Sequence, residues 1–355
     1  MRYSSPIRGL GVLGIGLLAS LAAPGIAPAA ETSLVIEAQD VLQLSVDQRR
    51  RLARGEVISY PVTENSDSEI AVGLAVFMPA QVSQLAQYLV SGQLIAQDAS
   101  ISEFAAVPDE VSPGSLVGPR FTSGEREEAE SLLEASPGTR FNLSLAEVEV
   151  FRAVRGSAGG SVKTGAAEIG SDTYRRLLQQ RVQTYRQGGL AGIAPYARSG
   201  GAVTDPAADL RLAASDAERL GHRGIDLREA LLRYPADQPA QMVSQLYWIK
   251  RRVQRRPHLS LLHRMVVTGD GSTIHVERYF YVGHSFNSIE ILTGALAYQD
   301  GTLVFSTTRV STDEVLGMGN HLKRTVARGQ VRDEMRARLD RLRAAFTKPV
   351  VPESP

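Results

Sequence analysis

Ser285 lies in a segment whose residue types could support hydrolysis. In 283-GHSFN-287 a glycine stands two residues before the serine and His284 stands beside it, as at the start of a hydrolase nucleophile elbow. The second glycine of that motif is replaced by Asn287, and the residues that follow are typical of a strand rather than a helix. The sequence therefore favours a bend between two antiparallel strands, in which Ser285 and Asn287 bond the turn backbone. The alternative is a serine-type hydrolase that uses Ser285 with His284 or His263.

A second set of polar residues lies in the strand-like run 274–284. Alternation along a strand predicts that four of them share one face: His275, Glu277, Tyr279 and Tyr281. If that face turns inward, these groups would orient a ligand in an otherwise apolar cleft; if it turns outward, they form the solvated side of a sheet. Arg278, on the opposite face, has the same two interpretations. Trp248 is a further candidate for ligand contact, beside its simpler role in core or lid packing.

Metal and thiol chemistry have little support. Four of the six histidines fall in one short window: His258, His263, His275 and His284. No HExxH or similar spacing fixes two of them as a zinc pair, so we expect no metal site and no cofactor. The chain has no cysteine, which excludes a disulfide framework and a thiol nucleophile.

The N-terminus is typical of a protein destined for export. Residues 1–30 combine a positive start, an apolar run and small residues before Ala29 and Ala30, which predicts a signal peptide cleaved near there; the alternative is a retained membrane anchor. No other apolar run approaches the roughly 20 residues of a membrane span. We therefore expect a periplasmic or secreted protein without a transmembrane span after cleavage.

Basic and acidic residues nearly balance, with 39 and 38 in the full chain, so nothing directs the protein to nucleic acid. The basic run 250–256 and the basic residues near the C-terminus are best explained as solvated faces, with peripheral membrane contact as the alternative.

The first elements are expected to be a helix, a hairpin and a second helix. Ser45 and Gln48 have capping-box spacing at the start of the first. Both faces of 69–79 are apolar or small, which predicts a strand covered on both sides. The predicted segments are a helix at 45–55, strands at 56–62 and 69–79, and a helix at 80–92.

The middle of the chain predicts short helices joined by Gly, Pro and Ser. Their predicted positions are 123–135, 144–155 (with Ser144 and Glu147 as a capping box) and 171–189, with further helices starting at Pro206, Asp226 and Pro239.

The last third returns to strands, joined in two places by glycine-containing tight turns, and ends in one long helix. The strands are predicted at 259–269, 274–284, 287–299 and 302–310, and the helix at 320–346. An apolar stripe along that helix, from Leu322 and Val326 to Leu342 and Phe346, needs a sheet to lie on.

This order of elements resembles the helix-grip arrangement of the START and Bet v 1-like superfamily over about half of the mature chain. The segment 80–92 would be the first helix and 320–346 the gripped helix. The resemblance rests on element order alone, and the helical middle departs from the compact form. It implies a cavity for a hydrophobic ligand.

Several phrases are also similar to those of a family of secreted bacterial proteins of unknown activity: 185-YRQGGLAGIAPY-196, 247-YWIKRR-252, 257-PHLSLLHR-264, 278-RYFYVGHSFNS-288 and 309-RVSTDEVLG-317. Because that family has no known activity, the similarity assigns no functional residue.

Together these patterns predict an α+β fold, in which a curved antiparallel sheet grips the C-terminal helix and carries a large helical insertion. The predicted divisions are a signal peptide (1–30), an N-terminal part of the sheet domain (31–111), a helical insertion or subdomain (112–254), the meander and C-terminal helix (255–346) and a disordered tail (347–355). The leading hypothesis is an exported protein that binds or carries a hydrophobic, lipid-like ligand. The alternatives are the Ser285 hydrolase and a non-catalytic envelope interaction module whose partner surface is 112–254; an enzyme is the less favoured class.

Overall fold

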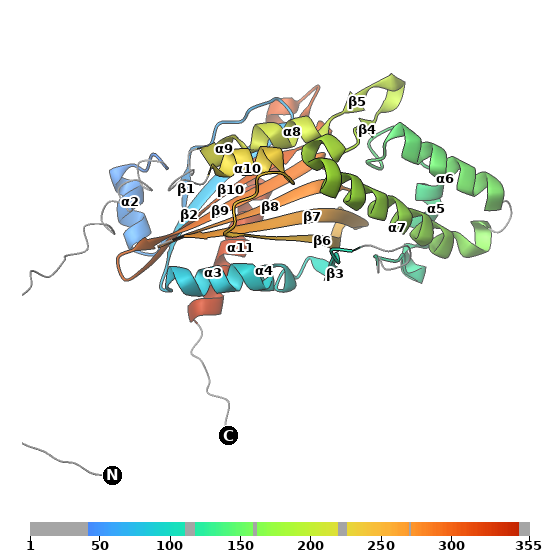
Figure 1. The fold of residues 1–355 in the computed structure, drawn as a ribbon. Helices are drawn as coiled ribbons and strands as arrows, with labels where there is room; N and C mark the ends of the chain where they lie inside the picture. The colour runs from blue at the N-terminus through green and yellow to red at the C-terminus, as the bar shows by residue number, and fades with distance from the viewer. Residues whose placement is uncertain (1–41, 111–117, 159–161, 219–225, 270, 348–355) are drawn as a thin grey trace, which may run out of the picture.

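The structure is a computed structural model that describes residues 42–110, 118–158, 162–218, 226–269 and 271–347. The predicted signal peptide and residues 348–355 lie outside the described residues. Within them, the centre of the fold is a curved antiparallel sheet of eight strands in the order β1-β2-β10-β9-β8-β7-β6-β3 (Figure 1). The strands are β1 (Ile58–Tyr60), β2 (Glu69–Met78), β3 (Ile101–Ala106), β6 (Met242–Val253), β7 (Arg256–Gly269), β8 (Ser272–Val282), β9 (Ser288–Tyr298) and β10 (Gly301–Ser311).

The sheet joins the two ends of the chain. β2 pairs with β10 along its whole length, from Met78 opposite Thr302 to Glu69 opposite Ser311. From β6 to β10 each strand pairs with the next, which makes a meander. The tight turns predicted between these strands are confirmed where they are described; Gln299, for example, has a φ of 52° before Gly301.

One face of the sheet, called the α11 face below, is covered by three helices: α3 (Val82–Ser91), α4 (Gln93–Ala96) and α11 (Asn320–Thr347). Alternate residues of β2, such as Leu74 and Val76, pack in one apolar cluster with Leu85 of α3 and with Met335 and Leu339 of α11. The apolar part of this face is therefore filled by side chains.

The opposite face, called the α7 face, is covered by helices from the middle of the chain: α7 (Val162–Gly188), α8 (Pro206–Ala213), α9 (Ser215–Glu218) and α10 (Leu227–Arg233). Tyr185 of α7 stacks on Phe280 of β8 with 3.9 Å between the ring centroids. The helical middle thus forms a layer on the sheet (Figure 1).

The remaining elements lie around these two layers. α5 (Arg126–Leu133) and α6 (Leu145–Ala158) pack against α7, and α2 (Val46–Ala53) packs against β1 and β2. The strands β4 (Tyr196–Ala197) and β5 (Val203–Thr204) form a separate small ladder. Short 3-10 turns complete the connections: Ser123–Glu125, Gly189–Gly192, Ser199–Gly201 and Asp313–Val315.

Several predicted helix starts are confirmed. The Ser45 side chain accepts from the Gln48 amide while the Gln48 side chain accepts from the Ser45 amide, which is the expected capping box. The Asp226 side chain accepts from the backbone of α10, and Pro206 stands in the first turn of α8.

The helix predicted to begin at Pro239 is wrong, because this segment enters the sheet as β6. Leu246 and Trp248 lie on its α7 face and Tyr247 and Ile249 on its α11 face, all buried. A short apolar run that is buried on both sides has no alternating pattern, so periodicity cannot separate it from a helix.

The long terminal helix is confirmed, but the apolar stripe predicted along it is only partly buried. Leu322 is 70% exposed and Val326 is 53% exposed, whereas Met335, Leu339 and Leu342 are buried. The first half of α11 is held by ion pairs, in which Arg324 and Arg328 both reach Glu64.

Among the described helices, none has both the length and the apolar character that a membrane span requires.

Candidate functional site

Polar side chains interrupt the apolar α11 face near its centre. Across three adjacent strands, Ser306 of β10, Thr293 of β9 and His275 of β8 lie opposite one another. In the next row Glu277 of β8 lies opposite Arg264 of β7. All of these side chains are buried. We call the following set the polar row: Arg264, Thr273, His275, Glu277, Thr293, Ser306 and Thr308.

The polar row is only partly satisfied by hydrogen bonds. Thr293 and Ser306 share one between their hydroxyls at 3.1 Å. Within the described residues, five buried atoms of the set have no hydrogen-bond partner: Nδ1 and Nε2 of His275, Oγ1 of Thr273, Oγ1 of Thr308 and Nε of Arg264. Because buried polar groups in proteins are nearly always paired, these atoms mark a place that can bind a polar group.

Glu277 is held by the terminal helix. The guanidinium of Arg338 donates to its two carboxylate oxygens, at 3.0 and 2.6 Å. Burial alone would raise the pKa of Glu277, but the charge of Arg338 and its hydrogen bonds lower that pKa to about 2. Glu277 is therefore a carboxylate at neutral pH.

His275 is the neutral member of the row. Burial lowers its pKa to about 4; Glu277, 3.6 Å away, opposes this shift, and the charges of Arg338 and Arg264 add to it. At neutral pH its ring therefore offers one donor and one acceptor, neither of which is used within the described part of the chain.

The alternation of β8 breaks at a β-bulge. Tyr279 lies opposite Leu262 and Tyr281 opposite Leu261, so Phe280 has no partner. Tyr279 stays on the α11 face, where its hydroxyl accepts from Arg251 at 2.8 Å. The expectation that Tyr281 shares this face is wrong, because the extra residue turns it to the other side.

Tyr281 instead joins a polar contact beneath α7. Its hydroxyl and that of Tyr174 share a hydrogen bond at 2.6 Å, and the guanidinium carbon of Arg181 lies 4.3 Å from the centroid of the Tyr281 ring. Arg181 donates in turn to Glu147 at 2.6 Å. These groups have partners and fix α7 on the sheet.

Arg278 and His263 are opposite each other on the α7 face. Arg278 is fully buried and donates to Glu290 at 2.7 Å and to the Leu231 carbonyl at 2.6 Å. The two ring nitrogens of His263 contact the hydroxyls of Tyr185 and Ser244, at 2.9 and 2.6 Å. Burial lowers the pKa of His263 to about 3.

Trp248 lies on the same face and is 7% exposed, in the apolar cluster that also contains Leu261 and Phe280. Its environment is that of a core residue. Of the predicted ligand-contacting residues, only His275, Glu277 and Tyr279 lie together on the α11 face.

Ser285 occupies a strained turn beside His284. Its φ is 66°, and the Phe286 amide donates to the His284 carbonyl at 2.8 Å, as in a γ-turn. His284 Nε2 donates to the Pro257 carbonyl at 3.0 Å, because that carbonyl can only accept. This leaves Nδ1 to accept from the Ser285 hydroxyl at 2.7 Å. Burial lowers the pKa of His284 to about 4, so the imidazole is neutral at pH 7.

This pair has the hydrogen bond of a serine nucleophile and a general base, and it uses His284 rather than His263. The amides after it are engaged elsewhere: that of Phe286 donates to His284, and that of Asn287 donates to the Ser311 carbonyl at 2.7 Å. In this conformation they do not form an oxyanion hole.

The bend itself is held by a buried network. The Arg198 guanidinium donates to the side-chain oxygens of Asn142, Asn287 and Asp313, at 3.0, 2.9 and 2.7 Å. The predicted bend at 283–287 is confirmed, but its two polar side chains do not bond the turn backbone: Asn287 bonds these side chains and Ser285 bonds the His284 ring.

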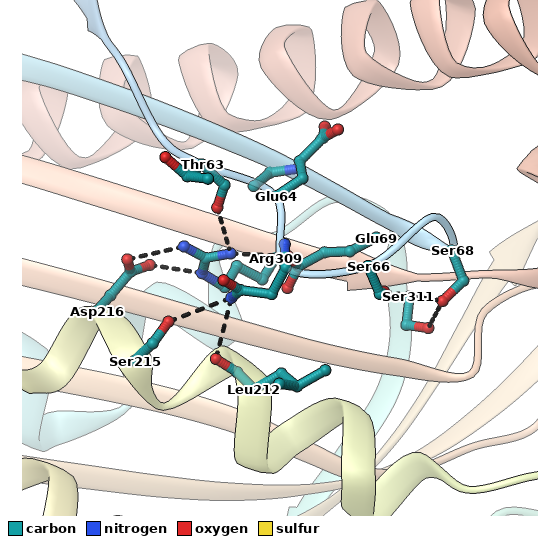
Figure 2. Close-up of polar contacts among 12 residues, drawn as sticks. Thr63, Glu64, Ser66, Ser68, Glu69, Leu212, Ser215, Asp216, Arg309 and Ser311 are labelled. Carbon is teal, nitrogen blue, oxygen red and sulfur yellow. Dashed lines mark hydrogen bonds and ion pairs between the residues drawn. The ribbon is translucent and has the colours of Figure 1, made fainter.

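Arg309 organises a second polar cluster, between β2, β10 and α9 (Figure 2). It donates to Asp216 at 2.7 and 2.8 Å, to Glu69 at 2.8 Å and to the Thr63 carbonyl at 3.0 Å. Asp313, four residues further along the chain, pairs with Arg198 and not with Arg309. Arg309 thus joins the sheet to the helical layer.

A small cavity of about 10 Å³ lies beside this cluster, lined by Ser66, Glu69, Asp209, Leu212, Ala213, Ser288, Arg309 and Ser311. This volume suits about one water molecule. Burial raises the pKa of Asp209 to about 6. The cavity is too small for a lipid-like ligand.

No group of three metal-ligating side chains comes together in the described part of the chain.

Neither the protein families nor the curated proteins that were searched include a match to this chain. A solved structure that the chain resembles is the crystal structure of Ara h 8.0201, a Bet v 1 allergen, at 9% identity and a TM-score of 0.19. The match covers 29% of this chain and 65% of that chain. A likeness of this strength carries no argument about function.

Proposed function

We propose that the protein is an exported binding protein that holds a small amphipathic, lipid-like molecule between α11 and the sheet. The observation that supports this most is the set of unpartnered polar atoms around His275, in a sheet face that is otherwise apolar. A polar end group at His275 would satisfy the two ring nitrogens and the Nε of Arg264 on the neighbouring strand, and the apolar part would lie against residues such as Leu74 and Val76.

We further propose that the arrangement is a helix grip like that of the START and Bet v 1-like proteins. The order of elements supports it. α3 and α4 connect β2 to β3, which lies at the opposite edge of the sheet. Strands β6 to β10 then pair in sequence back to β2, and α11 packs on β2.

Binding would require α11 to move, because Met335, Leu339 and Leu342 now fill the apolar part of the face. In the first half of this helix only Val331 packs against the apolar cluster, and Arg324 and Arg328 pair with Glu64. The residues that fill the face lie in the second half, so opening the interior requires that half to move and the Arg338–Glu277 pair to break.

Native mass spectrometry of protein purified from its own host, with organic extraction, tests the proposal. We expect a lipid-like species in stoichiometric amount, and His275→Phe protein should lose it. Trp248→Phe is the matched control, because Trp248 is a buried residue of the α7 face and its replacement should leave the bound species in place. Absence of any bound species from the wild type, together with no displacement of N-phenyl-1-naphthylamine by added lipids, contradicts the proposal.

A serine-type hydrolase is the second candidate function, and the hydrogen bond from Ser285 to neutral His284 favours it. In that reaction His284 would take the hydroxyl proton while Ser285 attacks an ester carbonyl. Hydrolysis of short-chain nitrophenyl esters by the wild type, Ser285→Ala and His284→Gln tests it. Both variants should fall to background; equal rates remove this candidate.

A further inference from the structure

Arg264 is a buried cation without an ionic partner. It is 4% exposed, lies on the α11 face and donates to the Leu89 carbonyl near the end of α3 at 3.2 Å. Its guanidinium carbon lies 5.1 Å from the centroid of the Tyr247 ring. Its Nε has no hydrogen-bond partner within the described residues.

The other buried cations of the described chain do not share this property. Five have a carboxylate partner: Arg181 with Glu147, Arg198 with Asp313, Lys250 with Glu125, Arg278 with Glu290 and Arg309 with Glu69. Arg264 forms no such pair with any described carboxylate, although Glu277 lies opposite it on the next strand. Glu277 is already engaged by Arg338.

Removing an arginine from water is costly unless an anion compensates its charge. The Leu89 carbonyl at a helix C-terminus compensates part of the Arg264 charge, but it bonds only one N–H of the guanidinium. Within the polar row the one carboxylate is Glu277, and Arg338 already neutralises it, so the charge of Arg264 has no counterpart there.

We propose that Arg264 and His275 bind the negatively charged head group, a carboxylate or a phosphate, of the amphipathic ligand. This inference rests on the proposed function and specifies the ligand class. A planar guanidinium pairs with either anion through two parallel hydrogen bonds, and the neutral His275 ring donates a third. Thr273, two residues from His275 on β8, supplies a hydroxyl on the same face.

Displacement of N-phenyl-1-naphthylamine tests the head group, with four probes: oleate, oleoyl lysophosphatidic acid, oleyl alcohol and inorganic phosphate. Wild-type protein should bind the better of the two anionic lipids at least about tenfold more tightly than the alcohol, and the one that binds better identifies the head group. Arg264→Gln should lower the affinity for that lipid by about 10- to 100-fold. Its affinity for oleyl alcohol should change by less than about twofold. Arg252→Gln, which removes an exposed arginine of β6, is the matched control and should behave as wild type.

Each other result has a distinct meaning. Equal affinity of the wild type for oleate, lysophosphatidic acid and oleyl alcohol would overturn the head-group inference and leave the proposed function standing. If none of the three lipids binds, the proposed function fails and the inference with it. If inorganic phosphate binds as tightly as lysophosphatidic acid, the head-group inference is also overturned, because the site would then bind a free anion. The comparison of lipids within the wild type holds even if Arg264→Gln does not fold. Arg264→Lys, which keeps the charge but removes the planar guanidinium with its two parallel donors, serves as the second variant.

Discussion

Glu277 of β8 and Arg338 of α11 form an ion pair with two hydrogen bonds, at 2.6 and 3.0 Å, in the centre of the α11 face. The Glu277 side chain is 1% exposed and that of Arg338 is 17% exposed. The pair is a direct polar link between the polar row and the terminal helix. It therefore fixes where α11 lies and also neutralises the carboxylate nearest to His275.

Glu277→Gln should lower the free energy of unfolding by about 3 kcal/mol, because Arg338 would be left without its anion in a largely buried place. Urea unfolding followed by circular dichroism measures this. Arg336→Gln, on the exposed side of the same helix, should change it by less than about 0.5 kcal/mol.

The double variant Glu277→Gln/Arg338→Gln separates the pair from its surroundings. Because the double variant leaves no unpaired charge, its loss of stability should be smaller than the sum of the losses of the two single variants, by more than about 1 kcal/mol. Additive losses would mean that the two side chains do not depend on each other.

Lowering the pH below about 6.5 should destabilise the protein, because its buried histidines take up protons only when it unfolds. Burial lowers the pKa of four histidines: to about 4 for His275 and His284, to about 3 for His263, and well below the ordinary value for His258. The unfolded chain binds these protons near pH 6.5 and the folded chain does not, so stability is complete above about pH 6.5 and falls as the pH drops toward 4.

At about 1.4 kcal/mol per proton and pH unit, four histidines contribute a slope of about 5 kcal/mol per unit below pH 6, and Asp209, whose pKa burial raises to about 6, opposes it by about 1 kcal/mol per unit. Urea unfolding at pH 7.5, 6.5, 6.0 and 5.5 measures it. His263→Phe should lose about a quarter of the histidine contribution. A stability that stays constant down to pH 5 would show that the histidines become protonated without unfolding.

Ser285→Gly should be more stable than Ser285→Ala by about 1 kcal/mol. Both replacements remove the hydroxyl that bonds His284, so their difference isolates the cost of holding a side chain at a φ of 66°. Thermal unfolding of the two variants side by side measures it. Equal melting temperatures would mean that the turn relaxes to a negative φ.

The elements that the sequence predicted correctly have strong local signals. The Ser45 capping box, the glycine turns of the late strands and the long terminal helix depend on residues close together in the chain. The prediction that 69–79 is a strand covered on both faces is also confirmed, because β2 is buried along nearly its whole length.

The errors arose where distant residues decide the outcome. Lys250 belongs to a basic run that the sequence predicted to be solvated. In the structure Lys250 is buried in β6, where the carboxylate of Glu125, far away in sequence, accepts from it at 2.8 Å. The bulge at Phe280 could not be predicted either, because it depends on how β8 is paired with β7. For the same reason the polar row could only be predicted in part: Arg264 joins it from a different strand.

Tyr279 and Tyr281 test that bulge directly, since a regular strand would give them the same surroundings. Tyr281→Phe leaves the buried Tyr174 hydroxyl without its partner and should cost about 1 to 3 kcal/mol of stability, while ligand binding at the α11 face stays unchanged. Tyr279→Phe removes the group that accepts from Arg251 and should instead change the affinity for anionic lipids. The double variant Tyr174→Phe/Tyr281→Phe should be no less stable than Tyr281→Phe alone, because no hydroxyl then remains unpaired. Equal effects of Tyr279→Phe and Tyr281→Phe on both stability and binding would mean that the two side chains share one face and that the bulge is absent.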